Sequence, residues 1–403
     1  MITPTQPSPI EVEGFRSCPS PSMGEARWGW RSRNFAVIVL QLLILVVSTA
    51  CSSNGIQNQK TSSIPKFSLR WQTDVVAGVS AIAWSDDSKR LAVTSENDHD
   101  NSIFEVLTHK RISHWRGNCV FTHLGIALTP DGRQAIACPQ REGETHLPSV
   151  VSVVDADTGQ PLRRVTVDGK LWGTKPFAQS FALSPEGRQL ATVPGLPMGR
   201  LVLFDTVSWL PTTILEWPET YGPYGVFPRQ IQAVAFSHDG AKVAAGALSG
   251  AVEICVIATR ACQNLDNGPS GWVETLAFTP DDTHLIAGSR TLGGGPTNDP
   301  STNRRIIEKS RNHMRGWEVA SGRQDLTSAP DDRAIHFLSV HPTGRIFAVA
   351  YRDSPGVGIY ATDTFRQIGK LETSEGSYAL AFSPDGRMLA ASDFEHLMIY
   401  DVK

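Results

Sequence analysis

The stretch AFSPDGRMLAASDFEHLMIYDVK, residues Ala381–Lys403, decides the fold because its first half is one of seven copies of a single pattern. In each copy an apolar segment leads into a turn of the Ser/Thr-Pro-Asp-Gly type, and a second apolar segment follows. Proline presets φ at the second turn position, and glycine adopts the left-handed conformation without steric cost. The pattern predicts seven β-hairpins, whose turn motifs begin at Trp84, Leu128, Leu183, Phe236, Phe278, Val340 and Phe382.

A second hairpin follows most copies, as in Val150–Val165 and Arg200–Leu215, so each repeat contains four short strands. The repeat length of about 48 residues is close to that of propeller blades. Two copies have Ser88 and Asp282 where the others have glycine, and aspartate tolerates left-handed geometry better than most residues. The sequence therefore predicts an all-β fold, a seven-bladed β-propeller of four-stranded antiparallel blades over residues 67–403.

The last repeat has only three strands of its own, Tyr378–Phe382, Met388–Ala391 and Leu397–Val402. Phe67–Val76 precedes the first repeat and has the pattern of a strand without a hairpin partner. An unpaired edge strand exposes backbone hydrogen-bonding groups. We therefore expect the last blade to be closed by the N-terminal strand, which would tie down both ends of the domain.

The repeats resemble those of the WD-repeat family, and the resemblance covers everything after residue 66. The first turn matches, as does the second turn in Val154–Gly159. The Gly-His dipeptide of the family is absent, and its Trp-Asp dipeptide is replaced by Phe-Asp, Trp-Glu, Tyr-Ala and Tyr-Asp. The resemblance implies a divergent bacterial branch whose propellers are closed by the N-terminal strand. It leaves activity open, because one fold hosts many functions and related propellers include lactonases.

The only strongly apolar segment, Phe35–Val47, follows three arginines and is closed by Ser48-Thr49-Ala50-Cys51. A basic region, a short apolar run and small residues predict a secretory signal. The run is shorter than the roughly 20 residues that cross a bilayer. It resembles a bacterial lipoprotein signal, which implies lipidation of Cys51 and a membrane anchor on the extracytoplasmic side. Ser48 departs from that pattern, since Leu or Val is usual there; cleavage without lipidation and an uncleaved anchor remain open.

The segments around this signal complete the domain plan. Residues 1–22 are rich in Pro and Ser and are interpreted as a disordered extension or a misassigned start, because Met23 begins a conventional signal. Residues 23–50 form the predicted signal peptide and residues 51–66 a polar tether, followed by the propeller at 67–403.

Insertions concentrate in two classes of loop, those between the second and third strands of a blade and those between blades. The long examples are Cys138–Ser149, Glu216–Gln230 and Gly288–Arg315. Both classes open on the same face of a propeller, and function concentrates in loops. This long-loop face is the predicted binding surface.

Two of these loops carry distinctive side chains. One has four aromatic residues that suit protein or glycan contacts or, equally, a small satellite core: Trp217, Tyr221, Tyr224 and Phe227. The other is basic, through Arg304, Arg305, Lys309, Arg311 and Arg315, and is interpreted as a solvated loop or a patch for acidic lipid or polymer.

A recurring position, five residues before the turn Ser/Thr, falls at the start of each inner strand. The first two repeats have Ser80 and Leu124 there. The other five have polar side chains that predict either a hydrated channel or a small-molecule site at the channel mouth: Gln179, Gln232, Glu274, His336 and Tyr378.

Four cysteines of the propeller allow two sensible disulfides, in the oxidising environment that export implies. Cys255 and Cys262 flank a short turn symmetrically and would face each other across two strands. Cys119 and Cys138 would lie toward the same face. Four free thiols are the alternative.

The remaining composition narrows the class of function. The net charge of −3 provides no basic field for nucleic acid, which we exclude as a partner. The sequence has no zinc-binding spacing, no G-x-S-x-G elbow and no phosphate-binding loop, so we predict no metal and no cofactor. The favoured function is a non-enzymatic protein-binding scaffold of the bacterial cell envelope, with another envelope protein as partner. The alternative is a propeller-type hydrolase or lactonase acting at the channel mouth.

Overall fold

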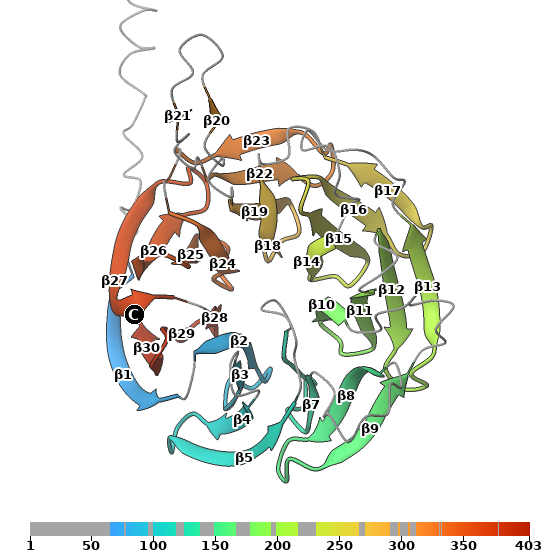
Figure 1. Ribbon diagram of the computed structural model, residues 1–403, viewed down its shortest axis with the longest axis vertical. Coiled ribbons are helices and arrows are strands. Elements are labelled where there is room, and N and C mark those ends of the chain that lie inside the picture. The colour runs from blue at the N-terminus through green and yellow to red at the C-terminus, as the bar shows by residue number, and fades with distance from the viewer. Residues whose placement is uncertain are drawn as a thin grey trace, which may run out of the picture. The chain divides into compact units, whose positions relative to one another are not determined.

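The computed structural model describes residues 65–403, apart from short segments between strands. These segments are residues 76–77, 96–99, 118–124, 138–148, 167–177, 195–198, 217–230, 266–270, 291–296, 299–304, 307–311, 330, 332 and 378. The described residues form seven four-stranded antiparallel sheets arranged in a ring (Figure 1) and contain no helix. The predicted seven-bladed β-propeller is confirmed.

The strands are numbered in chain order, and each blade is read from the innermost strand outward. Blade 1 comprises β2 (Val79–Trp84), β3 (Arg90–Ser95), β4 (Asp100–Glu105) and β5 (Lys110–Arg116). Blade 2 comprises β6 (Ala127–Leu128), β7 (Gln134–Ala137), β8 (Ser149–Asp155) and β9 (Pro161–Thr166). Blade 3 comprises β10 (Ala178–Leu183), β11 (Gln189–Pro194), β12 (Arg200–Asp205) and β13 (Pro211–Glu216). Blade 4 comprises β14 (Ile231–Phe236), β15 (Lys242–Ala247), β16 (Val252–Val256) and β17 (Ala261–Asn264).

The second half of the ring follows the same plan. Blade 5 comprises β18 (Trp272–Phe278), β19 (His284–Arg290), β22 (Met314–Glu318) and β23 (Gln324–Thr327); a two-stranded hairpin, β20 (Thr297–Asn298) and β21 (Arg305–Ile306), interrupts it. Blade 6 comprises β24 (Ile335–Val340), β25 (Ile346–Tyr351), β26 (Pro355–Ala361) and β27 (Gln367–Gly376). Blade 7 comprises β28 (Ala379–Phe382), β29 (Met388–Ser392), β30 (His396–Val402) and β1 (Phe67–Asp74).

The ring is closed by β1, which pairs with β30 from Phe67 opposite Val402 to Asp74 opposite His396. Backbone hydrogen bonds of 2.8 and 2.9 Å between Lys66 and Lys403 continue the ladder at its lower end. The predicted closure by the N-terminal strand is confirmed, with the strand ending at Asp74. Figure 1 shows the first and last strands of the chain lying side by side in this blade.

We call the end of the ring where the innermost strands begin the upper face and the opposite end the lower face. Each innermost strand is joined to the second strand by a five-residue turn on the lower face in all seven blades, for example 85–89 and 383–387. Connections on the upper face range from residues 377–378 to residues 291–313, the last of which contains the hairpin of β20 and β21. All of the length variation predicted for the long-loop face is therefore on the upper side.

The lower turns are built by short side chains. In blade 1 the Ser85 hydroxyl donates to an Asp87 carboxylate oxygen at 2.7 Å and accepts from the Arg90 N–H at 3.0 Å. The same bonds recur in other blades, for example between Thr129 and Asp131 at 2.6 Å. Ser88 and Asp282 have φ of 57° and 55°, the left-handed conformation for which other blades use glycine.

Each lower turn also packs against the turn of the next blade. A Cβ on Gly187 would lie 2.5 Å from Pro130, so this approach requires glycine. The His341 ring lies 2.9 Å from the Gly386 carbonyl oxygen, and the Asp385 N–H donates to the Ser88 hydroxyl at 3.2 Å across the closure of the ring. The lower face is thus a continuous ring of turns of fixed length.

Candidate functional site

Three of the five polar residues expected at the channel mouth occupy a shared structural feature, a β-bulge near the start of the innermost strand. In blade 4, Ile231 pairs with Ala247 but Ala233 pairs with Gly246, so Gln232 is an extra residue. The same one-residue shift in blades 1, 5 and 6 makes extra residues of Ser80, Glu274 and His336. Bulges redirect a side chain and are common beside functional sites.

These bulged side chains are buried rather than open to solvent. The exposed fractions of the whole residues are 8% for Ser80, 9% for Gln232, 7% for Glu274 and 4% for His336. Gln179 lies in β10, where the register also shifts between Ala178 and Phe181, but its side chain is outside the described residues. Tyr378 and Leu124 also lie outside them.

Glu274 is held by an arginine at the upper end of the same hairpin. The Arg290 Nε donates to the Glu274 carboxylate at 2.7 Å, and the Glu274 side chain is 1% exposed. The guanidinium also lies 4.7 Å from the ring centre of Trp272, a cation–π distance. Arg290 and Trp272 are cross-strand partners, and the bulge brings the Glu274 carboxylate to the same guanidinium. Arg290 is therefore held in place by both the carboxylate and the indole ring.

A second supported arginine lies at the upper end of blade 6. Arg333 makes a two-pronged contact with Asp331, with its Nη2 at 2.6 Å, and its guanidinium lies 3.8 Å from the ring centre of Tyr351. The hydrogen bonds that Arg333 donates to the Asp331 carboxylate raise the pKa of Arg333. Burial, followed by the neighbouring Tyr360, raises the pKa of Tyr351, so its hydroxyl stays protonated.

Tyr351 links this cluster to the bulge residue of blade 6, because it is the cross-strand partner of Ile335, which directly precedes His336. The Tyr351 and Tyr360 hydroxyls are hydrogen-bonded to each other. A Cβ on Gly358 would lie 2.6 Å from the Tyr360 ring, so the pair needs glycine at that position. The upper ends of blades 5 and 6 therefore carry two fixed cations within a buried polar framework.

Sequence reasoning missed Arg290, Arg333 and their aromatic partners. One signal was available for Arg290. In a hairpin whose turn is Thr279–Thr283, Arg290 falls at the end of the second strand, opposite the start of the first strand and close to Glu274. Arg333 gives no such signal, because it lies in an irregular link between blades and its partners come from the same link and from β25.

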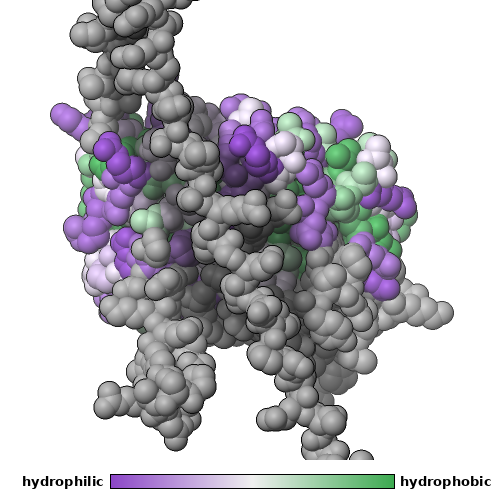
Figure 2. Space-filling model, turned by 90° about the horizontal axis from the view of Figure 1, so that it is seen from above, coloured by the Kyte–Doolittle hydropathy of each residue, from purple (hydrophilic) through white to green (hydrophobic). Residues whose placement is uncertain are grey.

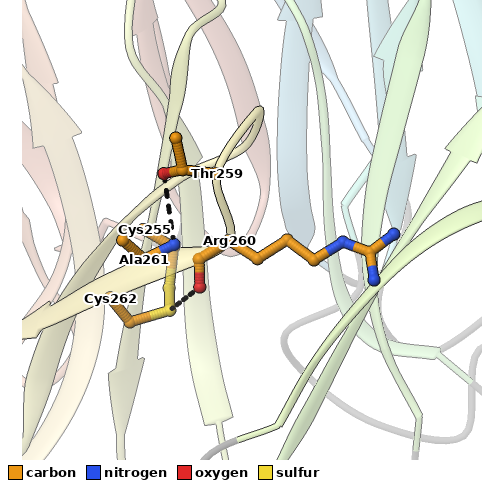
Figure 3. Close-up of a disulfide and its surroundings, with 5 residues drawn as sticks. All are labelled: Cys255, Thr259, Arg260, Ala261 and Cys262. Carbon is orange, nitrogen blue, oxygen red and sulfur yellow. Dashed lines mark hydrogen bonds between the residues drawn. A yellow bond between two sulfur atoms is a disulfide. The ribbon is translucent and has the colours of Figure 1, made fainter.

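The structure contains a disulfide between Cys255 of β16 and Cys262 of β17 (Figure 3). The two residues are direct cross-strand partners, as expected from their symmetric spacing, with Cα atoms 4.0 Å apart. The Ala261 N–H in the same turn donates to the Thr259 hydroxyl at 3.3 Å, while the Arg260 side chain extends away from the sulfur atoms. The bridge fixes the outermost strand of blade 4 to its neighbour.

Several expected site residues lie outside the described part of the chain. They are the aromatic set Trp217, Tyr221, Tyr224 and Phe227, the cysteines Cys51, Cys119 and Cys138, and the basic residues Arg304, Lys309 and Arg311. Arg305 is described only as part of β21. Arg315 is not in a loop: it lies half-buried in β22, and its Nη1 donates to Gln324 at 2.8 Å. Burial lowers the pKa of Arg315.

The side chains described at the upper ends of blades 5 and 6 are better suited to binding a ligand or partner than to acid–base chemistry. Both upper arginines are paired with carboxylates and are partly exposed, so each can offer ordered N–H donors rather than a free acid or base. Among the described residues no group of three His, Cys, Asp or Glu side chains could hold a metal ion.

The fold and these upper ends define the class of the chain: a seven-bladed β-propeller with uniform lower turns and bulged, polar upper strand ends. No model of a known protein family matches the chain, and no curated protein matches it significantly. Within the described residues, no helix has the length and apolar character needed to cross a membrane.

Proposed function

We propose that this propeller is a non-enzymatic binding scaffold of the bacterial cell envelope, anchored through a lipid on Cys51, and that its upper face holds another envelope protein. It would be a divergent relative of the WD-repeat propellers, a proposal supported by the recurrence of the Ser/Thr–Asp turn in most blades.

One observation carries the proposal, the difference between the two faces. The seven lower turns between the first and second strands have the same length and pack on one another, whereas the upper connections differ widely in length. A surface that carries partner-specific loops on a rigid frame is the usual design of a binding module. At the upper ends of blades 5 and 6, Arg290, Arg333 and Trp272 are partly exposed, and arginine and tryptophan are enriched in protein interfaces.

Site-specific photocrosslinking in intact cells tests which face is used. A crosslinking amino acid replaces Glu395, exposed in the upper turn of blade 7, and in a matched variant it replaces Arg133, exposed in a lower turn of blade 2. We expect a discrete crosslinked partner from position 395 and none from position 133. Equal crosslinking from both faces, or crosslinking from position 133 alone, would contradict the proposal.

A hydrolase or lactonase at the upper ends of the inner strands is the second candidate. The observation in its favour is that bulges place Gln232, Glu274 and His336 at corresponding positions of three successive blades. Purified protein should be screened for hydrolysis of esters and lactones. Activity that is lost in His336→Ala, while the melting temperature is kept, would replace the scaffold proposal with the hydrolase.

A further inference from the structure

The exposed apolar side chains of the propeller are gathered on one part of its surface. Seven large apolar side chains of the described residues are substantially exposed, and six of them lie at or beside the lower end of an outer strand pair. The seventh, Phe394, is on the upper face. The six are Leu69, Leu107, Leu162, Val207, Leu210 and Val256, and we call them the lower rim.

The lower rim follows consecutive blades. Its members belong to blades 7, 1, 2, 3 and 4 in the order of the ring. The most exposed members are Val207 and Leu210, at 81% and 63% in the turn between β12 and β13, and Leu107, at 64% in the turn between β4 and β5. Figure 2 views the ring from its edge and shows hydrophobic residues among hydrophilic ones on both its left and its right side.

The other blades lack this feature. The corresponding turn of blade 5 has Ala320 and Arg323 at the positions of Val207 and Leu210, and that of blade 6 has Asp363 and Arg366. The apolar residues of those two turns, Val319 and Phe365, are buried at 7% and 3% exposure. Single exposed apolar residues are ordinary, whereas apolar residues gathered together mark contact surfaces. Val207 and Leu210 share one turn, and the other four lie at the same end of neighbouring blades.

The chain enters the propeller at this rim. Lys66 is hydrogen-bonded to Lys403 at the lower end of blade 7, directly before Phe67. The apolar run Phe35–Val47 and Cys51 precede it in the sequence. A chain spans at most about 3.5 Å per residue, so residues 51–66 keep the lower end of blade 7 within roughly 55 Å of Cys51.

We propose that the lower rim rests on the surface of a lipid bilayer, with Val207, Leu210 and Leu107 inserted among the outer parts of the acyl chains. This inference rests on the membrane anchor of the proposed function, because the anchor limits how far the rim can move from the bilayer. Aliphatic side chains on turns gain free energy in the interfacial region by leaving water. The upper face then points away from the membrane, toward the partner.

Photolabelling by a phospholipid with a diazirine in its acyl chain tests the contact. The full chain is incorporated into phosphatidylethanolamine–phosphatidylglycerol vesicles, floated, irradiated and digested, and the labelled peptides are identified by mass spectrometry. We expect label in peptides that contain residues 105–111 and 205–212. The double variant Val207→Ser/Leu210→Ser should lower the label at residues 105–111 several-fold, and the matched upper-face variant Phe394→Ser should leave it unchanged.

The outcomes separate this inference from the proposed function. Floated protein that is labelled only within residues 1–64 retains the anchor and overturns the contact of the rim. Protein that does not float with the vesicles overturns the membrane anchor itself, and the rim contact with it. Floated protein whose rim is unlabelled but crosslinks to a second copy or another protein assigns the rim to a protein interface and also overturns the inference.

Discussion

Replacing Trp71 in the closing strand should destabilise the whole ring, because this side chain connects blade 7 to blade 1. Trp71 is 7% exposed, and its indole N–H donates to the Val106 carbonyl at 3.1 Å. Its ring centre lies 6.3 Å from that of Phe104 and 5.0 Å from that of His109. All three contacts lie in blade 1, whereas the backbone of Trp71 pairs with β30 of blade 7.

The expected loss follows from the size of the side chain. Truncation of a buried tryptophan to alanine costs about 3–5 kcal/mol, and we take about 4 kcal/mol for the Trp71→Ala variant. An unfolding entropy of about 2.1 cal/mol/K per residue amounts to about 0.7 kcal/mol/K for the propeller, so the melting temperature should fall by about 6 °C. Differential scanning calorimetry of the full chain measures it.

A matched control lies on the same strand. Leu69 is 52% exposed, so Leu69→Ala should change the melting temperature by about 1 °C or less. Deletion of residues 67–74 removes the fourth strand of blade 7 and should lower the melting temperature more than Trp71→Ala does. A Trp71→Ala protein that melts within about 1 °C of the parent would refute the view that β1 locks the ring.

Three further predictions concern the outer and lower turns. Arg260 has φ of 58° in an exposed turn, so Arg260→Gly should raise the free energy of unfolding in urea by about 0.5–1 kcal/mol; a decrease would contradict strain at this position. The hydrogen bond from Thr129 holds the pKa of Asp131 below its usual value, so the stability that the Asp131 carboxylate contributes is lost as pH falls. The Asp131→Asn variant should therefore show a smaller decline in melting temperature than the parent between about pH 5 and about pH 3. An unchanged decline would refute this role of Asp131. Reduction of the bridge between Cys255 and Cys262 should cost about 2–3 kcal/mol by thermal denaturation, with a protein carrying serine at both positions insensitive to the reductant.

The sequence predicts most of the frame because the turn pattern is local. Proline, aspartate and glycine determine the backbone conformation of the five-residue turn in which they lie, so the lower turns of all seven blades can be predicted from the amino-acid sequence alone. Closure by β1 follows too, because a three-stranded last repeat leaves one edge without a partner.

The upper strand ends are harder to predict, since their geometry depends on register rather than composition. The segment IQAVAF of β14 reads as a strand with or without the shift at Gln232. The ion pair of Glu274 with Arg290 depends on a bulge that adds one residue to one strand only. Sequence reasoning therefore found the polar positions but neither their burial nor their arginine partner.

An insertion experiment tests whether the uniform lower turns are constrained by packing. In blade 3, Ser184 makes three hydrogen bonds that close the turn. The Ser184 N–H donates to the Gln189 carbonyl at 2.8 Å, and the Ser184 hydroxyl accepts from the Gln189 N–H at 2.9 Å. The Ser184 carbonyl accepts from the Gly187 N–H at 2.8 Å. Gly187 also packs against Pro130 of blade 2. One glycine inserted after Glu186 should disrupt these contacts and cost about 2–3 kcal/mol, at about 1 kcal/mol per hydrogen bond.

The same insertion in the upper connection of that blade, within residues 195–199, is the matched control. Lengthening a loop costs little closure entropy, about 0.6 kcal/mol for each doubling, so we expect a change of a few tenths of a kcal/mol. If the two insertions lowered the melting temperature equally, packing between turns could not explain why the lower face is uniform, and the contrast between the faces would lose its value as a sign of function. A large loss for the lower insertion alone would mean that only the upper face is free to change with its partner.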